Sequence, residues 1–294
     1  MIPDILQIEH MQPKESIMQK TAVVILNYMN YQETLICVES VLLQKNVSFQ
    51  VVVVDNGSAN ESFRILAEQY RHNRLVHVIR ARKNYGFARG NNIGIQYARK
   101  RLQTDFVLLI NSDTVMTDKN YIYTLLSHIG KKVGVVGSEI ILRSGKKQKP
   151  YYEYVEFPAT FIYYCYLLSG LYGINALENR MERLLGKRRR EQVMHGSALM
   201  LTPGYFEAYN GLYSRTFLYG EEILLYIMCK RAGLEQVYAG DTSIFHKEDQ
   251  SSKFLFRNRN TVQAKYELQS YKYVVWESFK DFIKYKILKY RRMG

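Results

Sequence analysis

The sequence has few cysteines, few prolines, a deficit of acidic residues and no long apolar run at its start. Three scattered cysteines, Cys37, Cys165 and Cys229, are too few for a disulfide framework or a cysteine-based zinc site, so a reducing cytoplasm is the expected location. Five prolines and 18 glycines in 294 residues exclude a collagen-like or low-complexity chain. Charged side chains interrupt residues 1–20, so we expect no secretory signal peptide there.

Two common nucleotide-binding motifs are also missing. No G-x-G-x-x-G follows the first apolar run, which argues against a dinucleotide-dependent dehydrogenase, and the absence of G-x-x-x-x-G-K-[ST] excludes P-loop phosphate chemistry. Lysine and arginine total 41 against 27 aspartates and glutamates, a formal net charge of +14, and 25 residues are tyrosine. This balance predicts attraction to an anionic partner: a nucleic acid, a membrane surface or a phosphorylated substrate.

Short apolar runs alternate with helical patterns over the first part of the chain. Strands are expected at residues 21–26, 50–54, 75–79 and 106–110, and helices at residues 32–44, 61–71 and 91–101. The alternation predicts an α/β fold with a mostly parallel, Rossmann-like sheet flanked by helices, in which ligands bind at the carboxyl ends of the strands.

After residue 145 this pattern changes. Residues 157–177 carry no formal charge, and residues 178–190 end in a run of basic side chains. The uncharged segment has the length of a membrane span, although its tyrosines and Pro158 make it a poor one. An interfacial or partner-binding helical pair and a plain buried helix are the alternatives. Near the C-terminus, residues 277–292 mix apolar and lysine side chains at helical spacing, which predicts a basic amphipathic helix.

Small polar and acidic residues follow the expected strands. Asn27 and Tyr28 follow the first strand, Asp55 begins the turn after the second, and Asn111 and Asp113 follow the fourth. Because the carboxyl ends of parallel strands share one edge of the sheet, we expect these side chains to converge on a crevice. There, Asp55 can hydrogen-bond a nucleobase or ribose, and Asp113 can hold a divalent metal that bridges a diphosphate. The alternative is that both aspartates only form turns.

Two further features lie in the second half of the chain. Glu221 and Glu222 precede an apolar helical segment, where the helix dipole stabilises acidic residues; one of them facing the crevice could also act as a general base. His246 follows an expected strand at residues 242–245. A lone histidine is most often structural, but it becomes a good additional ligand if Asp113 holds a metal.

Seven short motifs follow one another between residues 21 and 255. They are VVILNY, VVVVDNGS, NYGFARGNN, LLINSD, HGSALML, FLYGEE and IFHKEDQSS. In this order and at this spacing they resemble the inverting family 2 glycosyltransferases with the GT-A fold, and in particular the rhamnosyltransferase-like enzymes of bacterial surface polysaccharide synthesis. The resemblance implies transfer of a sugar from a UDP- or dTDP-sugar to a hydroxyl of a glycan or lipid-linked glycan, with Mg²⁺ or Mn²⁺ as cofactor.

The resemblance also implies roles for individual residues. Asp113 and His246 would hold the metal, and Gly196 and Ser197 would lie under the acceptor. The implied nucleotide-sugar site consists of Asn27, Tyr28, Asp55, Asn84, Gly86, Phe87, Asn91, Asn111 and Asp113. Glu222 stands where the family usually has its catalytic aspartate and is the favoured base, with Glu221 as the other candidate.

Three positions depart from the family pattern. Asn111 replaces the first aspartate of the Asp-x-Asp motif, which weakens the expected metal binding. Leu224 and Met228 stand where an acidic residue and an arginine are common, which predicts altered acceptor recognition or reduced activity. A catalytically inactive GT-A scaffold is therefore one alternative. A basic nucleic-acid-binding protein is another, although no recognition motif supports it and no nucleic acid is expected as partner.

The expected organisation has three parts. They are an N-terminal arm (1–20), a glycosyltransferase domain (21–255) and basic amphipathic C-terminal helices (256–294). The glycosyltransferase domain is expected to divide into a nucleotide-sugar half (21–115) and an acceptor half (116–255), and the acceptor half includes a helical insert at 157–190. The uncharged and basic segments predict a peripheral enzyme at the anionic inner face of the cell membrane, where a polyprenyl-diphosphate-linked acceptor would be held. Solvated surfaces or a homodimer contact are the alternative explanation of these segments.

Overall fold

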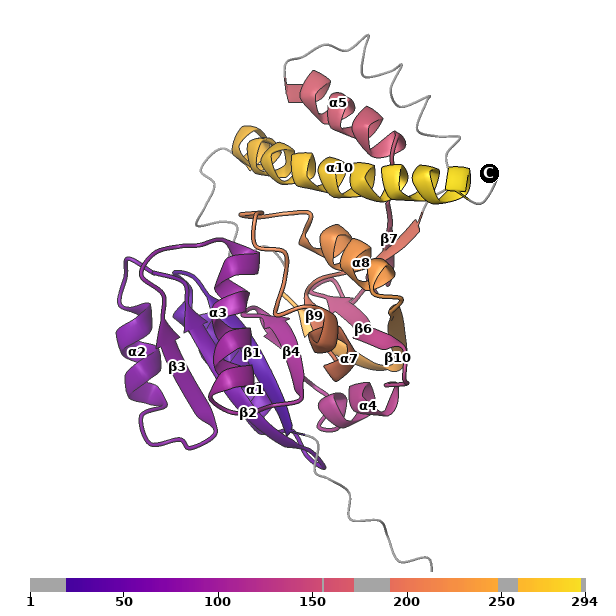
Figure 1. Ribbon diagram of the computed structural model, residues 1–294. Helices are drawn as coiled ribbons and strands as arrows, with labels where there is room; N and C mark the ends of the chain where they lie inside the picture. The colour runs from indigo at the N-terminus through magenta and orange to yellow at the C-terminus, as the bar shows by residue number, and fades with distance from the viewer. Residues whose placement is uncertain (1–19, 155, 172–190, 248–258, 292–294) are drawn as a thin grey trace, which may run out of the picture.

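The computed structural model describes residues 20–154, 156–171, 191–247 and 259–291, and at its centre is an eight-stranded sheet (Figure 1). The strand order across this sheet is β3-β2-β1-β4-β9-β6-β10-β5. Its strands are β1 (Lys20–Asn27), β2 (Ser48–Asp55), β3 (Val76–Arg80), β4 (Phe106–Asn111), β5 (Thr114–Val115), β6 (Val133–Leu142), β9 (Ala198–Leu201) and β10 (Glu235–His246). A second, two-stranded sheet pairs β7 (Tyr151–Tyr154) with β8 (Glu191–Met194).

The first half of the sheet is parallel, as the sequence predicts. Ile25 of β1 lies in register with Val53 of β2 and with Ile110 of β4, and all three pairings of β1 to β4 are parallel. The strands are joined by α1 (Tyr31–Leu42), α2 (Ser62–Gln69) and α3 (Phe87–Lys100). Helix α3 begins earlier than expected, because Gly86, at a φ of 80°, turns the chain directly into the helix.

The second half of the sheet contains a reversed strand. β9 pairs antiparallel with both β4 and β6, and β10 pairs parallel with β6. The amino end of β9 therefore lies at the same edge as the carboxyl ends of β4, β6 and β10. This reversal brings residues 195–197, which precede β9, beside the polar residues that follow β4 and β10.

Helices cover both faces of the sheet because the strands are apolar on both sides. Val23 and Ile25 of β1 pack in a buried cluster with α1, α2 and α4 (Tyr121–Ser127). Ala22 and Val24, which alternate with them, pack in a second cluster with α3, α7 (Pro203–Ala208) and α8 (Glu221–Arg231). The predicted layered α/β architecture is confirmed.

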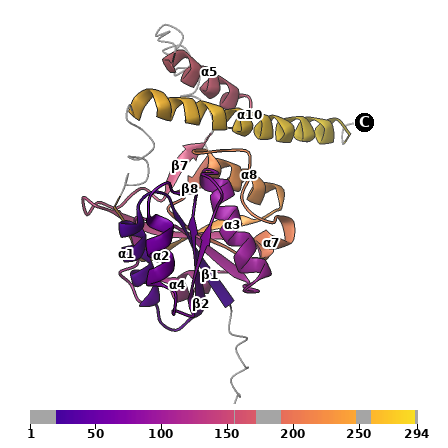
Figure 2. The same ribbon diagram turned by 90° about the vertical axis from the view of Figure 1, so that its left-hand side faces the viewer.

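Two further helices lie together beyond α8, on the side of the molecule opposite the start of β1 (Figures 1 and 2). They are α5 (Ala159–Leu171) and α10 (Arg259–Arg291). The C-terminal region was expected to form several helices, and its described part forms one instead, since neither proline nor glycine interrupts residues 259–291. No helix in the described ranges is long and apolar enough to cross a membrane. The basic run at 187–190 lies outside the described residues.

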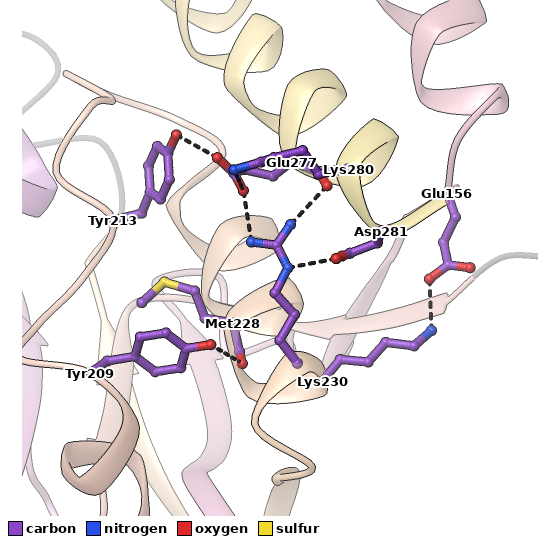
Figure 3. Close-up of polar contacts among 9 residues, drawn as sticks. Glu156, Tyr209, Tyr213, Met228, Lys230, Glu277, Lys280 and Asp281 are labelled. Atoms are coloured by element: carbon purple, nitrogen blue, oxygen red, sulfur yellow. Dashed lines mark hydrogen bonds and ion pairs between the residues drawn. The ribbon is translucent and has the colours of Figure 1, made fainter. Parts of the chain in front are cut away.

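An ion-pair network fastens α10 to the C-terminal end of α8 (Figure 3). Arg231 donates from Nη1 to Glu277 Oε2 at 2.7 Å and from Nε to Asp281 Oδ1 at 2.7 Å. Lys280 and the Tyr213 hydroxyl also contact the Glu277 carboxylate. Burial disfavours the charged form of Glu277, but these hydrogen bonds outweigh it and hold the pKa of Glu277 below its usual value.

Replacing Arg231 with methionine should destabilise the fold by about 1.5–3 kcal/mol, because it removes charged hydrogen bonds from the buried Glu277 carboxylate. The adjacent Lys230 pairs with Glu156 at 2.7 Å on an exposed surface, so Lys230→Met should cost at most about 1 kcal/mol. Urea unfolding of both variants measures the difference. Equal losses in the two variants would contradict this assignment.

Candidate functional site

Two adjoining cavities lie where the sequence predicts the crevice, at the ends of the strands. Each has a volume of about 240 Å³. Five residues contribute to the walls of both cavities: Phe87, Asn111, Leu218, Tyr219 and His246. The two cavities therefore form one crevice with a shared wall.

The first cavity has mostly uncharged walls. In addition to the shared residues, it is lined by Leu26, Tyr28, Asn56, Asn84, Gly86, Ser112, Asp113 and Phe217. The Asn56 amide donates to Asn84 Oδ1 at 3.0 Å and to the Gly86 carbonyl at 3.1 Å. Asn84 Oδ1 in turn accepts from the Gly86 N–H at 2.8 Å. These bonds hold the 84–86 loop as a rigid part of the cavity wall.

Three residues of the predicted nucleotide-sugar site lie behind this wall. Asn27 and Asp55 have no exposed surface, and Asn91 has almost none. The Asp55 carboxylate accepts from Asn27 Nδ2 at 2.8 Å and from the Ser58 N–H at 3.0 Å. Asn91 donates to the Phe87 carbonyl within α3. These side chains shape the loops that form the wall, and their direct contact with a nucleotide stays a prediction.

Asp113 and His246 come together at the shared wall. His246 Nε2 lies 3.3 Å from Asp113 Oδ1 and 3.5 Å from Asn111 Nδ2. β10 carries His246 to this point because it pairs antiparallel with the short β5 that follows Asp113. No cluster of three or more histidine, cysteine, aspartate or glutamate side chains suited to a metal occurs in the part of the chain that the structure describes. A metal here would need ligands from a bound molecule as well.

The second cavity contains the predicted carboxylate pair. Beyond the shared residues, it is lined by Gln148, His195, Gly196, Ser197, Glu221 and Glu222. A β-carbon at Gly196 would lie 2.5 Å from Glu222 Oε1, so only glycine permits this approach of the carboxylate. The backbone N–H of Gly196 donates to Glu222. Gly196 and Ser197 thus adjoin the candidate base.

Both carboxyl groups have raised pKa values. Burial, and then the charge of the neighbouring Glu222, raise the pKa of Glu221 to about 8. Burial also raises the pKa of Glu222, while its own N–H and that of Gly196 oppose the rise. Two adjacent buried carboxyls ionise with difficulty together, so the pair holds one proton over part of the pH range. The charge of Glu222 is a cause of the raised pKa of Glu221, which favours Glu221 as the site of that proton.

One loop joins the two cavities. We call residues 217–220, between the buried Thr216 and α8, the bridging loop; Leu218 and Tyr219 belong to the shared wall. Tyr219 has a φ of 74°, which is strained for a residue with a side chain. α10 supports the loop from outside: Ser270 Oγ donates to the Leu218 carbonyl at 2.8 Å, and the ring of Tyr266 stacks on Phe217 at 5.0 Å.

Sequence reasoning missed several residues of the crevice. His195 and Gln148 line the second cavity and contact each other at 3.1 Å, and Asn56 organises the first cavity. His195 is the first residue of the HGSALML motif, which is the sequence signal that could have identified it. Burial and the nearby His246 lower the pKa of His195, so its ring is neutral at physiological pH.

The two residues of α8 that depart from the family pattern, Leu224 and Met228, lie away from the crevice. Leu224 and Met228 are buried in apolar clusters, and neither lines a cavity. They pack α8 against its neighbours. Their effect on acceptor recognition or activity, and the inactive-scaffold alternative that rests on them, stay predictions.

The chain belongs to glycosyl transferase family 2, whose model matches residues 22–195, more than half of the sequence. It is 25% identical over 233 residues to "Low-salt glycan biosynthesis hexosyltransferase Agl10" of Haloferax volcanii, a match that covers 79% of this chain and 67% of that protein. It is 25% identical over 128 residues to "Glycosyltransferase GlyG" of Streptococcus pneumoniae serotype 4, covering 44% of this chain and 38% of that protein.

Solved structures with a similar fold include GalNAc-T7 and S. aureus TarS. GalNAc-T7 with UDP, GalNAc and Mn²⁺ matches with a TM-score of 0.57 at 13% identity, covering 81% of this chain and 45% of that one. S. aureus TarS matches with a TM-score of 0.54 at 15% identity, and the match covers 78% of this chain and 37% of TarS. The TarS 1–349 structure in complex with UDP-GlcNAc matches with a TM-score of 0.53 at 15% identity, and the match covers 84% of this chain and 64% of that one. These likenesses confirm the GT-A fold. The matched regions cover less than half of TarS and of GlyG.

Glu221→Gln should stabilise the protein increasingly as pH rises. Below pH 4.5 the Glu221 carboxyl is protonated in both the folded and the unfolded chain, so the variant and the wild type should have similar Tm values. Between 4.5 and about 8 the unfolded chain releases this proton while the folded chain retains it, which costs the wild type stability that glutamine does not lose. A rise in Tm of about 2 °C or more is expected at the alkaline end.

Thermal unfolding across this pH range measures the effect. Glu207→Gln, which replaces an exposed carboxyl on α7, is the control and should show no such trend. A pH-independent difference for Glu221→Gln would show that folding does not raise the pKa of Glu221.

Proposed function

We propose that the protein transfers a sugar from a UDP- or dTDP-sugar to a hydroxyl of a glycan or lipid-linked glycan, with inversion of the anomeric configuration. The observation that carries the proposal is the shared wall. It has an aspartate–histidine pair on the side of one cavity and a buried carboxylate pair in the other. A sugar bound at this wall would have its diphosphate near Asp113 and an acceptor hydroxyl near Glu222.

The first cavity suits the nucleotide. Tyr28 and Leu26 offer apolar contact to a base, and Asn84 and Asn56 offer amide hydrogen-bonding groups beside it. Asp55 and Asn27 support this wall from behind through their mutual hydrogen bond. The names of two solved relatives in fold include UDP or UDP-GlcNAc, which favours a uridine-type donor.

Asp113 and His246 fit a divalent metal. A carboxylate oxygen and an imidazole nitrogen 3.3 Å apart, both facing the cavity, are suitable ligands for Mg²⁺ or Mn²⁺ when diphosphate oxygens complete the shell. A bound ion would offset the negative charge of the departing nucleoside diphosphate. The Mn²⁺ in the GalNAc-T7 structure supports this assignment.

Glu222 is the proposed base. Its carboxylate faces the second cavity and receives the Gly196 N–H, which favours its charged form, whereas Glu221 retains the proton of the pair. A pKa above the ordinary glutamate range also makes Glu222 a stronger base than an exposed carboxylate.

The step is a single displacement. The acceptor oxygen forms a bond to the anomeric carbon as the bond from that carbon to the diphosphate oxygen breaks. The hydroxyl proton passes to Glu222, and the bonding pair leaves with the nucleoside diphosphate. Attack from the face opposite the leaving group inverts the anomeric configuration and requires no covalent intermediate.

The acceptor would lie in the second cavity. Gly196 and Ser197 line this cavity, and the neutral His195 ring can exchange hydrogen bonds with a sugar hydroxyl. Agl10 is a hexosyltransferase of low-salt glycan biosynthesis, which supports a glycan acceptor. We propose that this acceptor is part of a cell-surface polysaccharide assembled from the cytoplasmic side of the membrane.

Glu222→Gln should lower kcat about 10²–10⁴-fold, because glutamine retains the shape of the side chain but accepts no proton. The Kd for UDP, measured by calorimetry, should stay within about twofold. Glu221→Gln should lower kcat much less, and this difference identifies which of the two carboxyls is the base. Wild-type turnover by Glu222→Gln would place the base elsewhere.

The function itself is tested by release of nucleoside diphosphate from UDP-, dTDP- and GDP-sugars, with the anomeric configuration of the product followed by NMR. Chelation should abolish release and added Mn²⁺ should restore it, and Asp113→Asn should weaken that restoration. Release that is unaffected by EDTA would remove the metal role from Asp113 and His246. No release from any donor, in the presence of glycan acceptors, would contradict the proposed function.

A further inference from the structure

Helix α10 has an exposed face that other parts of the structure leave uncovered. The residues on it recur at intervals of three or four, which is the spacing of one helix face. They are Lys265, Gln269, Lys272, Trp276, Lys280, Ile283 and Ile287, and we call them the outer stripe. Trp276 is 50% exposed and Ile287 49%, large values for side chains of this kind.

The opposite face of α10 is fully engaged. Ser270 contacts the bridging loop, Glu277 binds Arg231 of α8, and the Ser278 hydroxyl accepts from the backbone N–H of Phe157 just before α5. Val274, between them, has no exposed surface. Because α8, α5 and the loop take up this face, the outer stripe points away from the body of the molecule.

The outer stripe contains basic and apolar side chains and no acidic side chain. The acidic residues described in α10, Glu267, Glu277 and Asp281, all lie off the stripe, although Glu277 pairs with Lys280 of the stripe. Lys284 and Lys286 are exposed beside it. The adjacent α5 carries no charged residue between Ala159 and Leu171. Lysines with tryptophan and isoleucine on one exposed helix face are typical of helices that lie in the headgroup region of a bilayer.

We propose that the outer stripe docks onto an anionic lipid bilayer, with its lysines at the phosphates and Trp276, Ile283 and Ile287 in the headgroup–acyl boundary. Charge decides between a bilayer and a second copy of the chain. A twofold dimer through this face would oppose lysine stripe to lysine stripe, whereas an anionic surface attracts every lysine on it. The inference does not depend on sugar transfer.

Docking would also place the crevice beside the bilayer, because the helix that carries the stripe holds the bridging loop on its other face. If the proposed function is correct, a lipid-linked acceptor could then reach Glu222 while the enzyme stays bound. This consequence rests on the proposed function, but the binding experiment below does not.

The chain supplies its own probe, since Trp276 is its only tryptophan. With vesicles of equimolar phosphatidylglycerol and phosphatidylcholine at low salt, we expect a blue shift of its emission, protection from acrylamide quenching, and co-sedimentation of the protein. Pure phosphatidylcholine vesicles should produce none of these effects, and high salt should weaken them.

Two matched variants identify the surface. Lys265→Gln, Lys272→Gln and Lys284→Gln together should weaken binding to anionic vesicles by about tenfold or more. The control combines Lys100→Gln, Lys131→Gln and Lys132→Gln, which removes the same charge from exposed positions at the opposite, amino edge of the sheet and should bind as the wild type does.

Three outcomes would overturn the proposal. One is an unchanged Trp276 emission with anionic vesicles. Another is an equal loss of binding in the two lysine variants, which would indicate a diffuse effect of net charge. The third is a blue shift that depends on protein concentration in the absence of lipid, which would show that a second copy covers the stripe.

Discussion

The crevice depends on the close approach of Gly86 to the bridging loop. A β-carbon at position 86 would lie 2.1 Å from the carbonyl oxygen of Phe217, and the Phe87 N–H donates to the same oxygen at 2.8 Å. From the other side, Ser270 of α10 binds the carbonyl of Leu218. The loop is thus held between the start of α3 and the C-terminal helix, and this restraint sustains the strained backbone of Tyr219.

This restraint fixes the position of the second cavity relative to the first. The loop leads directly into α8, whose first residues are Glu221 and Glu222, so the position of the carboxylate pair follows from that of the loop. A buried acidic pair in a chain of net charge +14 is unusual, and it can persist because only one of the two carboxyls needs to be charged. Among the described residues, no lysine or arginine lines either cavity, and some of the lysines lie on the outer stripe of α10, which suits them to a partner other than the donor.

The sequence predicts the parallel core well, because buried strands such as Val51–Val54 and the helices between them are encoded by local periodicity. Short polar motifs after apolar runs also mark the strand ends at Asp113 and His246, whereas the preference for Glu222 rests on the family resemblance. It cannot show whether such a side chain faces a ligand or an internal partner: Asp55 turns inward to Asn27 and Ser58. His195, Gln148 and the contact of α10 with the bridging loop arise from tertiary packing, which leaves no local pattern.

The most direct test of this account is the binding of UDP and the turnover of a UDP-sugar by Gly86→Ala, with the fold monitored by circular dichroism. An added methyl group must displace the Phe217 carbonyl, and a φ of 80° disfavours alanine at this position. We predict a folded protein in which UDP binding and turnover are both reduced at least tenfold. A folded variant with wild-type binding and turnover would contradict the claim that the bridging loop aligns donor and base.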